Sequence, residues 1–230
     1  MVTFFIIFIT SLIATALSSM SGGGASVINI PVLLSLGIPF PMATAAQKVS
    51  SSFWVLPASY NYLKDRKVDW RFLLLFSTIG LIGVYAGVAV IMQTNQRLLQ
   101  IIIGILILLL VAYTYFKKDV GLDEKKVYSK LRRSIAYVFA LILGFYESFF
   151  GSGNGIMFSI VTAFPWCVFA AGLLIYKGNF SWAIMTPIVL GSLIGGQIGS
   201  RYAKYKGNKF IKLMFVIIGS ILGIKLLVGI

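Results

Sequence analysis

The sequence predicts an all-α polytopic membrane protein, with about seven or eight transmembrane helices in two duplicated halves that contain glycine-broken or re-entrant segments. Of the 230 residues, 59% are hydrophobic and 11% are charged, and the mean hydropathy is +0.95. Soluble domains carry about 45–50% apolar and about 25% charged residues. Uncharged runs at 72–96, 98–116, 148–176 and 178–200 reach the roughly 20 residues that a spanning helix needs.

Glycine-rich stretches interrupt these apolar segments. The first is the triple glycine at 22–24, and the second lies at 151–155. Polypeptide without helical hydrogen bonds is tolerated at membrane depth mainly where it lines a protein-walled cavity. Broken segments in both halves of a membrane protein are also typical of transporter binding sites.

Charge and composition exclude several classes of function. The net charge is +14, but the basic residues lie in short loops, as the positive-inside rule expects, so no nucleic-acid partner is predicted. There is no histidine, and Cys167 is the single cysteine, which excludes an intrachain disulfide, a His-based triad and haem ligation by His. We expect no enzyme, no cofactor and no metal site. The expected partners are the lipid bilayer and a small anionic solute, and a homo-oligomer stays open.

The first half begins with a span at 3–17, which no Lys or Arg precedes, so we expect it not to be a cleaved signal peptide. After the triple glycine, residues 25–36 are long enough only for a half-span, read as a re-entrant or broken-helix arm. A span at 42–63 contains Lys48, and the basic loop 64–71 follows. Two further spans are expected, from this loop to about Met92 and at 98–116.

The second half follows a basic linker. Residues 117–133 carry seven basic and three acidic side chains, which indicates a cytoplasmic segment. Spans are expected at 134–150, 182–202 and 210–228, and whether 156–176 crosses fully stays open. Small residues repeat every four positions, which favours close helix packing; they are Gly83 and Gly87 in the first half and Gly191, Gly195 and Gly199 in the second.

An internal repeat divides the chain into a half at 1–116, the linker at 117–133 and a half at 134–230. Trp70 and Trp182 are 112 positions apart, and the same offset pairs Gly83 with Gly195. The glycine motifs are 131 positions apart instead. The second half therefore lacks about 19 residues, where the first half has the span that contains Lys48.

The first glycine break is the first candidate binding site. Unwound backbone and a half-helix N-terminus would offer N–H donors to an anion from Gly22, Gly23 and Gly24, with Ser21 adding a hydroxyl. Alternatively, these glycines only let helices pack closely.

Lys48 is the second candidate, because an ionisable residue within a span is costly. Thr44, Ser51 and Ser52 share its face at helical spacing, which suggests a wet, inward face. Lys48 would attract an anion there, or it would snorkel to the interface.

The second half offers an opposing set of candidates. Gly153, Asn154 and Gly155 would form the other side of the substrate site, with Asn154 donating without charge. Glu147 lies in an apolar helix beside this motif. It would be a proton-coupling carboxylate, a partner that neutralises Lys48, or an interfacial residue without a role.

The order of these motifs resembles the TauE/SafE family of sulfite and organosulfonate exporters, also called the toluene-sulfonate uptake permease group. The resemblance implies a bacterial-type plasma-membrane permease of two four-helix halves, with small sulfur-containing or organic anions as substrates. The chain departs from the family pattern in its shortened second half and at Glu147, where a small residue is expected. The matching residues are Ser21 to Gly24, Pro31, Gly37, Ala43 to Lys48, Ser51, Ser52, Val68 to Trp70, Gly144 to Tyr146, Phe150 to Gly155 and Lys206 to Ile211.

The expected function is a secondary transporter for a small anion such as sulfite, a sulfonate or another organic anion. The chain has no nucleotide-binding motif, so a gradient or a partner ATPase would drive it. The alternative is a membrane interaction protein or partner subunit without flux of its own. A channel is a third reading.

Overall fold

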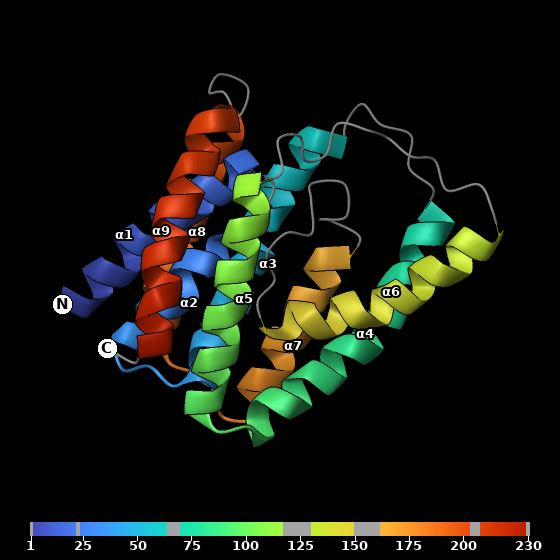
Figure 1. The fold of residues 1–230 in the computed structure, drawn as a ribbon, viewed down its shortest axis with the longest axis horizontal. Helices are drawn as coiled ribbons and strands as arrows, with labels where there is room; N and C mark the ends of the chain where they lie inside the picture. Colours follow the sequence, from blue (N-terminus) through green and yellow to red (C-terminus); the bar gives the residue numbers. More distant parts are fainter. Residues whose placement is uncertain are drawn as a thin grey trace.

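The computed structural model describes residues 2–21, 24–63, 70–116, 130–149, 162–202 and 208–228. These described residues form helices joined by short turns, with no strand among them (Figure 1). The helices are α1 (Val2–Ser21), α2 (Ala25–Ser35), α3 (Phe40–Leu63), α4 (Trp70–Gln93), α5 (Gln96–Phe116), α6 (Lys130–Phe149), α7 (Phe164–Tyr176), α8 (Trp182–Tyr202) and α9 (Asn208–Val228).

Helix length and composition confirm a polytopic membrane protein. Among the described residues, four segments are long and apolar enough to cross a bilayer: Val2–Met20, Trp70–Gln93, Gln96–Tyr113 and Trp182–Tyr202. α3 is as long as α4, at 24 residues, but it carries the polar residues of the predicted site. Shorter apolar helices complete the bundle.

The first glycine break is narrower than the sequence suggested. α1 continues to Ser21 rather than ending near residue 17, so Ser18 and Ser19 are helical. The chain resumes at Gly24, whose φ of 120° lies in a region that favours glycine. The predicted half-span is confirmed, because α2 has 11 residues. Gly22 and Gly23 lie outside the described residues.

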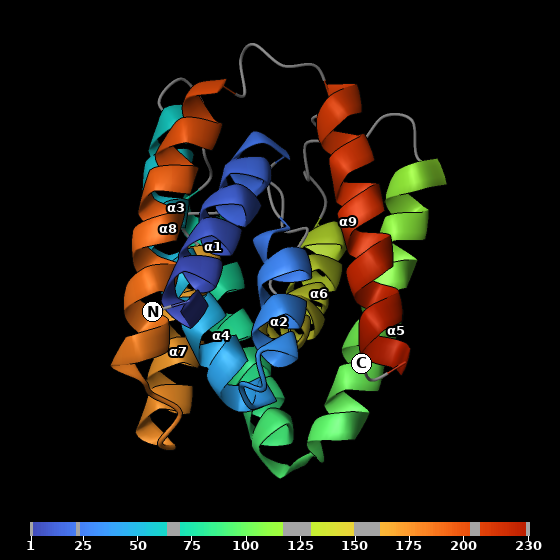
Figure 2. The same ribbon diagram turned by 90° about the vertical axis from the view of Figure 1, so that its left-hand side faces the viewer.

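Glycines bring two pairs of helices into backbone contact, as their spacing predicted. On α8, a Cβ at Gly195 or Gly199 would overlap the main-chain oxygen of Leu12 or Ala16 on α1. On α4, a Cβ at Gly83 would overlap the main-chain oxygen of Leu141 on α6. α1 and α8 run side by side in Figure 2, and α4 and α6 run side by side in Figure 1.

The C-terminal helix packs against α5. Both views show α5 and α9 adjacent. The Arg97 guanidinium, at the start of α5, donates to the main-chain oxygens of Leu226 and Leu227 at 3.2 and 2.8 Å. These carbonyls end α9 and have no helical partner, so Arg97 caps the helix.

The region 156–176 contains one short helix in its described part. α7 begins at Phe164 and has 13 residues, fewer than a spanning helix needs. Residues 156–161 lie outside the described residues. α7 packs against α3 and α4. α1, the first helix of the first half, packs against α8 of the second half. α6, the first helix of the second half, packs against α4 of the first half. This pairing is compatible with a duplication, which stays a prediction.

Candidate functional site

Lys48 and Glu147 form an ion pair between α3 and α6. Lys48 Nζ lies 2.9 Å from Oε1 of Glu147, and the two side chains are 1% and 2% exposed. The same ammonium also donates to the main-chain oxygen of Glu147. Lys48 therefore does not snorkel, and Glu147 is not interfacial. Of the geometries that the sequence left open, the structure shows Glu147 as the partner of Lys48.

Polar side chains of α3 surround the lysine at helical spacing. Thr44 precedes it by one turn, and its buried hydroxyl has no hydrogen-bond partner within the described part of the chain. Ser51 is buried on the same face. Ser52 is half-buried and donates to the main-chain oxygen of Lys48 at 2.9 Å, so its hydroxyl is engaged within the helix. The lysine face thus retains one unused donor, Thr44.

A chain of hydrogen bonds runs from α2 to this ion pair. The Asn29 amide donates to Gln47 Oε1 at 2.8 Å, and the Gln47 amide donates to Ser51 Oγ at 3.1 Å. Ser51 in turn interacts with Cys167 on α7, whose thiol lies 3.5 Å from Glu147 Oε1. Four helices, α2, α3, α6 and α7, therefore meet at one buried polar cluster.

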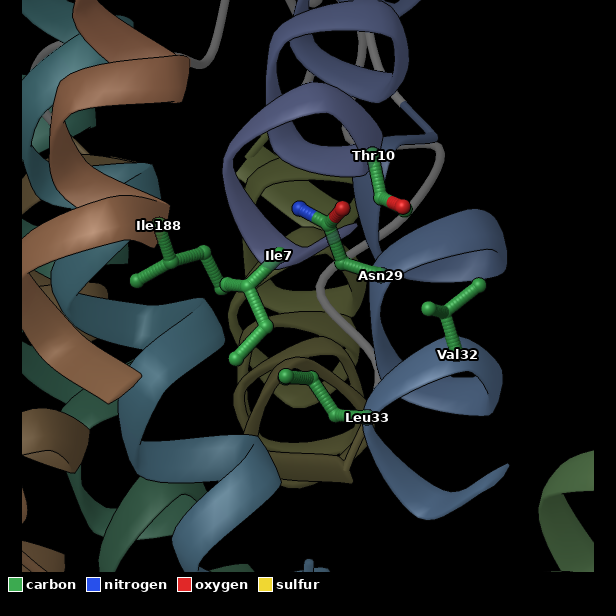
Figure 3. Close-up of a pocket in the computed structure, with 6 residues that line it drawn as sticks. All are labelled: Ile7, Thr10, Asn29, Val32, Leu33 and Ile188. Atoms are coloured by element: carbon green, nitrogen blue, oxygen red, sulfur yellow. The ribbon is translucent and has the colours of Figure 1, made fainter. Parts of the chain in front are cut away.

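A small hollow lies at the start of this chain. It leaves no room for a water molecule, and it is lined by Ile7, Thr10, Asn29, Val32, Leu33 and Ile188. Figure 3 shows the Asn29 side chain extending from α2 into it. The lining comes from α1, α2 and α8 and is apolar apart from Thr10 and Asn29. Asn29 thus links the hollow to the polar cluster.

The structure brings together some of the predicted site residues. Thr44, Lys48, Ser51 and Glu147 lie in or beside the buried cluster. Gly24 is the N-cap residue of α2, and Ser21 ends α1. Gly22, Gly23, Gly153, Asn154 and Gly155 lie outside the described residues, so an opposed pair of glycine breaks stays a prediction.

Three members of the cluster were not predicted: Asn29, Gln47 and Cys167. Asn29 and Gln47 are amides in long uncharged segments, which is a signal for an inward-facing position. Cys167 carried no signal, because a lone cysteine in an apolar run behaves as a small hydrophobic residue. The described residues contain no group of three His, Cys, Asp or Glu side chains placed to hold a metal ion.

Comparison with known proteins places the chain in a family. The model of the family described as sulfite exporter TauE/SafE matches residues 7–226. A probable membrane transporter protein, ORF9, of a Sinorhizobium species is 28% identical over 96% of this chain and 91% of its own length. One from Haemophilus influenzae is 26% identical over 96% and 93%.

A third relative, the probable membrane transporter protein YfcA of Escherichia coli, is 25% identical over 96% of this chain and 88% of its own length. No solved structure matches the chain. The family match extends over nearly the whole sequence and agrees with the all-helical, apolar fold. The chain belongs to the TauE/SafE family of membrane transporter proteins.

Proposed function

We propose that this protein is a secondary transporter of the plasma membrane that moves a small anion, with sulfite and sulfonates as the first candidates. The observation that carries the proposal is the buried pair of Lys48 and Glu147 at the junction of α3 and α6. An ionisable residue inside a membrane protein is by default a candidate for a transport pathway.

The pair gives the lysine a counter-ion that a substrate can replace. Burial of an unpaired charge is costly, so Lys48 needs an anion beside it in every conformation. In the conformation described here, Glu147 fills this role. When Glu147 takes up a proton it becomes neutral, and a small anion can bind Lys48 in its place. One proton and one negative charge then move together, so the charge of the cluster is unchanged.

Neighbouring groups fit an anion beside Lys48. The Thr44 hydroxyl has no partner within the described residues, and a hydroxyl can donate to an oxyanion. The Cys167 thiol, 3.5 Å from the Glu147 carboxylate, is a weak donor on the opposite helix. The names of the relatives, probable membrane transporter proteins, support transport, and the family description names sulfite.

Flux into proteoliposomes tests this proposal. Methanesulfonate is a suitable labelled probe because it stays ionised at every pH of the assay and does not cross lipid as a neutral acid. Sulfite is measured in parallel. We expect Lys48→Ala to abolish uptake of both anions while the protein still inserts. Lys225→Ala, near the end of α9, is the matched control and keeps uptake at the wild-type rate.

The outcomes separate the alternatives. Unchanged flux in Lys48→Ala would remove the lysine from the mechanism. Absence of flux in the wild type for every small anion, together with stable co-purification of one partner protein, would replace the proposal with the reading of a non-transporting partner subunit. Flux that does not saturate with concentration would indicate a channel.

A further inference from the structure

Three buried residues that take no part in the ion pair carry hydrogen-bond donors. Ser19, Ser50 and Trp54 are 2%, 0% and 9% exposed. The two hydroxyls and the indole N–H have no partner within the described residues. Burying such a group without a hydrogen bond costs roughly 1–3 kcal/mol. Native proteins seldom retain several such groups in one place without a reason.

Ser19 of α1 and Trp54 of α3 both approach Gly196 of α8. A Cβ placed on Gly196 of α8 would lie 2.9 Å from the Trp54 Cβ and 3.7 Å from the Ser19 hydroxyl oxygen. Ser50 precedes Trp54 by one turn of α3. Trp54 also belongs to the same buried apolar cluster as Ala25, the first residue of α2. The N-terminus of α2, which no side chain caps, therefore belongs to the same region of the bundle.

Trp166 is a second buried tryptophan of the bundle, and its indole N–H is paired. The Trp166 ring lies on Gly80 of α4, whereas Trp54 meets Gly196 of α8 through its Cα and Cβ. The Trp166 indole N–H donates to the main-chain oxygen of Ser77 at 2.7 Å. The Trp54 indole N–H donates to nothing described. A buried indole N–H of this bundle can thus pair with a main-chain carbonyl, and the Trp54 N–H differs in having no such partner among the described residues.

The chemistry of the cluster selects the ligand. An indole N–H is only a donor, so its partner must bring an acceptor, which excludes a metal cation at that atom. Among the described residues the single carboxylate is Glu147, and it is paired with Lys48. Nothing described around Ser19, Ser50 and Trp54 would therefore repel an anion. The N-terminus of an α-helix adds a positive partial charge.

We infer that Ser19, Ser50 and Trp54 form a binding subsite for a small oxyanion, separate from Lys48. Uncharged donors and the N-terminus of α2 hold the anion there, as donors in many proteins hold sulfate or phosphate. The subsite is closed in this conformation, because all three side chains are buried. Binding does not depend on the transport cycle proposed above, and it can be measured without flux.

Thermal unfolding of the detergent-solubilised protein, titrated with sulfite and separately with methanesulfonate, tests the inference. Both anions are expected to raise the midpoint temperature of the wild type. Trp54→Phe keeps the aromatic ring and removes the N–H. It should weaken binding about tenfold or more, the usual effect of losing one hydrogen bond to a charged ligand. Ser50→Ala is the second variant and should also weaken binding.

Two controls show that the effect is local. Ser192→Ala removes a buried hydroxyl of α8 that already donates to Val189 O at 2.8 Å, and it should leave affinity unchanged. Without ligand, Trp54→Phe should not lower the midpoint temperature, because its donor is unpaired. Trp166→Phe should lower it, because the carbonyl of Ser77 loses its donor.

Three results would overturn the inference. One is equal affinity in Trp54→Phe, Ser50→Ala and the wild type. Another is absence of any anion-dependent stabilisation in the wild type. The third is a ligand-free Trp54→Phe that is as destabilised as Trp166→Phe, which would show that the Trp54 N–H bonds to an internal water. Loss of flux in Lys48→Ala without loss of binding would leave this subsite in place.

Discussion

The ammonium of Lys48 on α3 and the carboxylate of Glu147 on α6 are 2.9 Å apart, although 99 positions separate them in the sequence. The contact joins the two predicted halves of the chain at a buried place. It also links to α2 and α7 through neutral polar side chains. Stability and transport should therefore both depend on this pair, in ways that can be separated.

Removing one partner of the pair should destabilise the protein more than removing both. Lys48→Met or Glu147→Leu alone leaves a buried charge without a counter-ion, which costs about 3–5 kcal/mol. The double variant replaces the pair with apolar groups and should be about neutral. Thermal unfolding in detergent of the wild type, both single variants and the double variant measures the coupling energy. Additive effects of the two single changes would show that the pair does not form.

The contact between α1 and α8 should depend on glycine at the point of closest approach. At Gly195 a Cβ would overlap the main-chain oxygen of Leu12 and the Thr15 hydroxyl, so Gly195→Ala should force the helices apart and destabilise the protein. Gly172 on α7 has open space around its Cβ position. Gly172→Ala is the control and should be neutral or stabilise by up to about 1 kcal/mol. Equal midpoint temperatures for the two variants would contradict the packing.

Hydropathy and glycine spacing predicted most of the architecture. α4, α5 and α8 begin and end within a few residues of the expected spans, since long apolar runs fix helices of about 20 residues. The glycines at 83, 87, 195 and 199 indicated the contacts that they make, but not which helix each would face. Helix partners follow from the three-dimensional topology, and the sequence pattern does not specify them.

The site was harder to predict than the fold. Lys48 was conspicuous as a charge in an apolar segment, and its pairing with Glu147 was one of three readings, because nothing local links residues 99 positions apart. The first span was predicted to end at residue 17, yet α1 includes Ser18 and Ser19. Serine has a modest helix propensity, and burial against α8 outweighs it. Trp54 was not a predicted site residue, since sequence does not show whether an indole N–H has a partner.

The side-chain hydrogen bond between Asn29 on α2 and Gln47 on α3 should contribute to stability. Asn29→Leu removes the donor to Gln47 Oε1 and leaves a buried acceptor unpaired, which costs about 1–3 kcal/mol. Thr94→Val is a suitable control, because its hydroxyl is exposed where it donates to Val90 O, and surface changes usually stay within about 0.5 kcal/mol. Unfolding midpoints provide the comparison. If Asn29→Leu unfolds at the same temperature as Thr94→Val, the hydrogen bond between Asn29 and Gln47 does not stabilise the protein.

Arg97 should hold the end of α9 against α5. Arg97→Ala removes the guanidinium that donates to Leu226 and Leu227, and a cost of about 1 kcal/mol is expected for a partly exposed cap. Arg97→Lys keeps the positive charge but loses the paired donors, so it should lower the stability by less than Arg97→Ala does. Hydrogen exchange of the last turn of α9 measures the effect directly. Unchanged exchange in Arg97→Ala would show that the cap does not hold the helix end.

The measurement that most directly tests the account is pH-driven uptake of labelled methanesulfonate by proteoliposomes that contain Glu147→Gln. A proton and an anion that bind together move in the same direction, so wild-type vesicles with an alkaline interior should concentrate the anion. Glutamine mimics the neutral, protonated carboxylate, but it cannot take up or release a proton in the pH range of the assay. The variant should therefore equilibrate methanesulfonate across the membrane without concentrating it. Concentration by Glu147→Gln equal to that of the wild type would contradict the proposal that Glu147 alternates with the transported anion at Lys48.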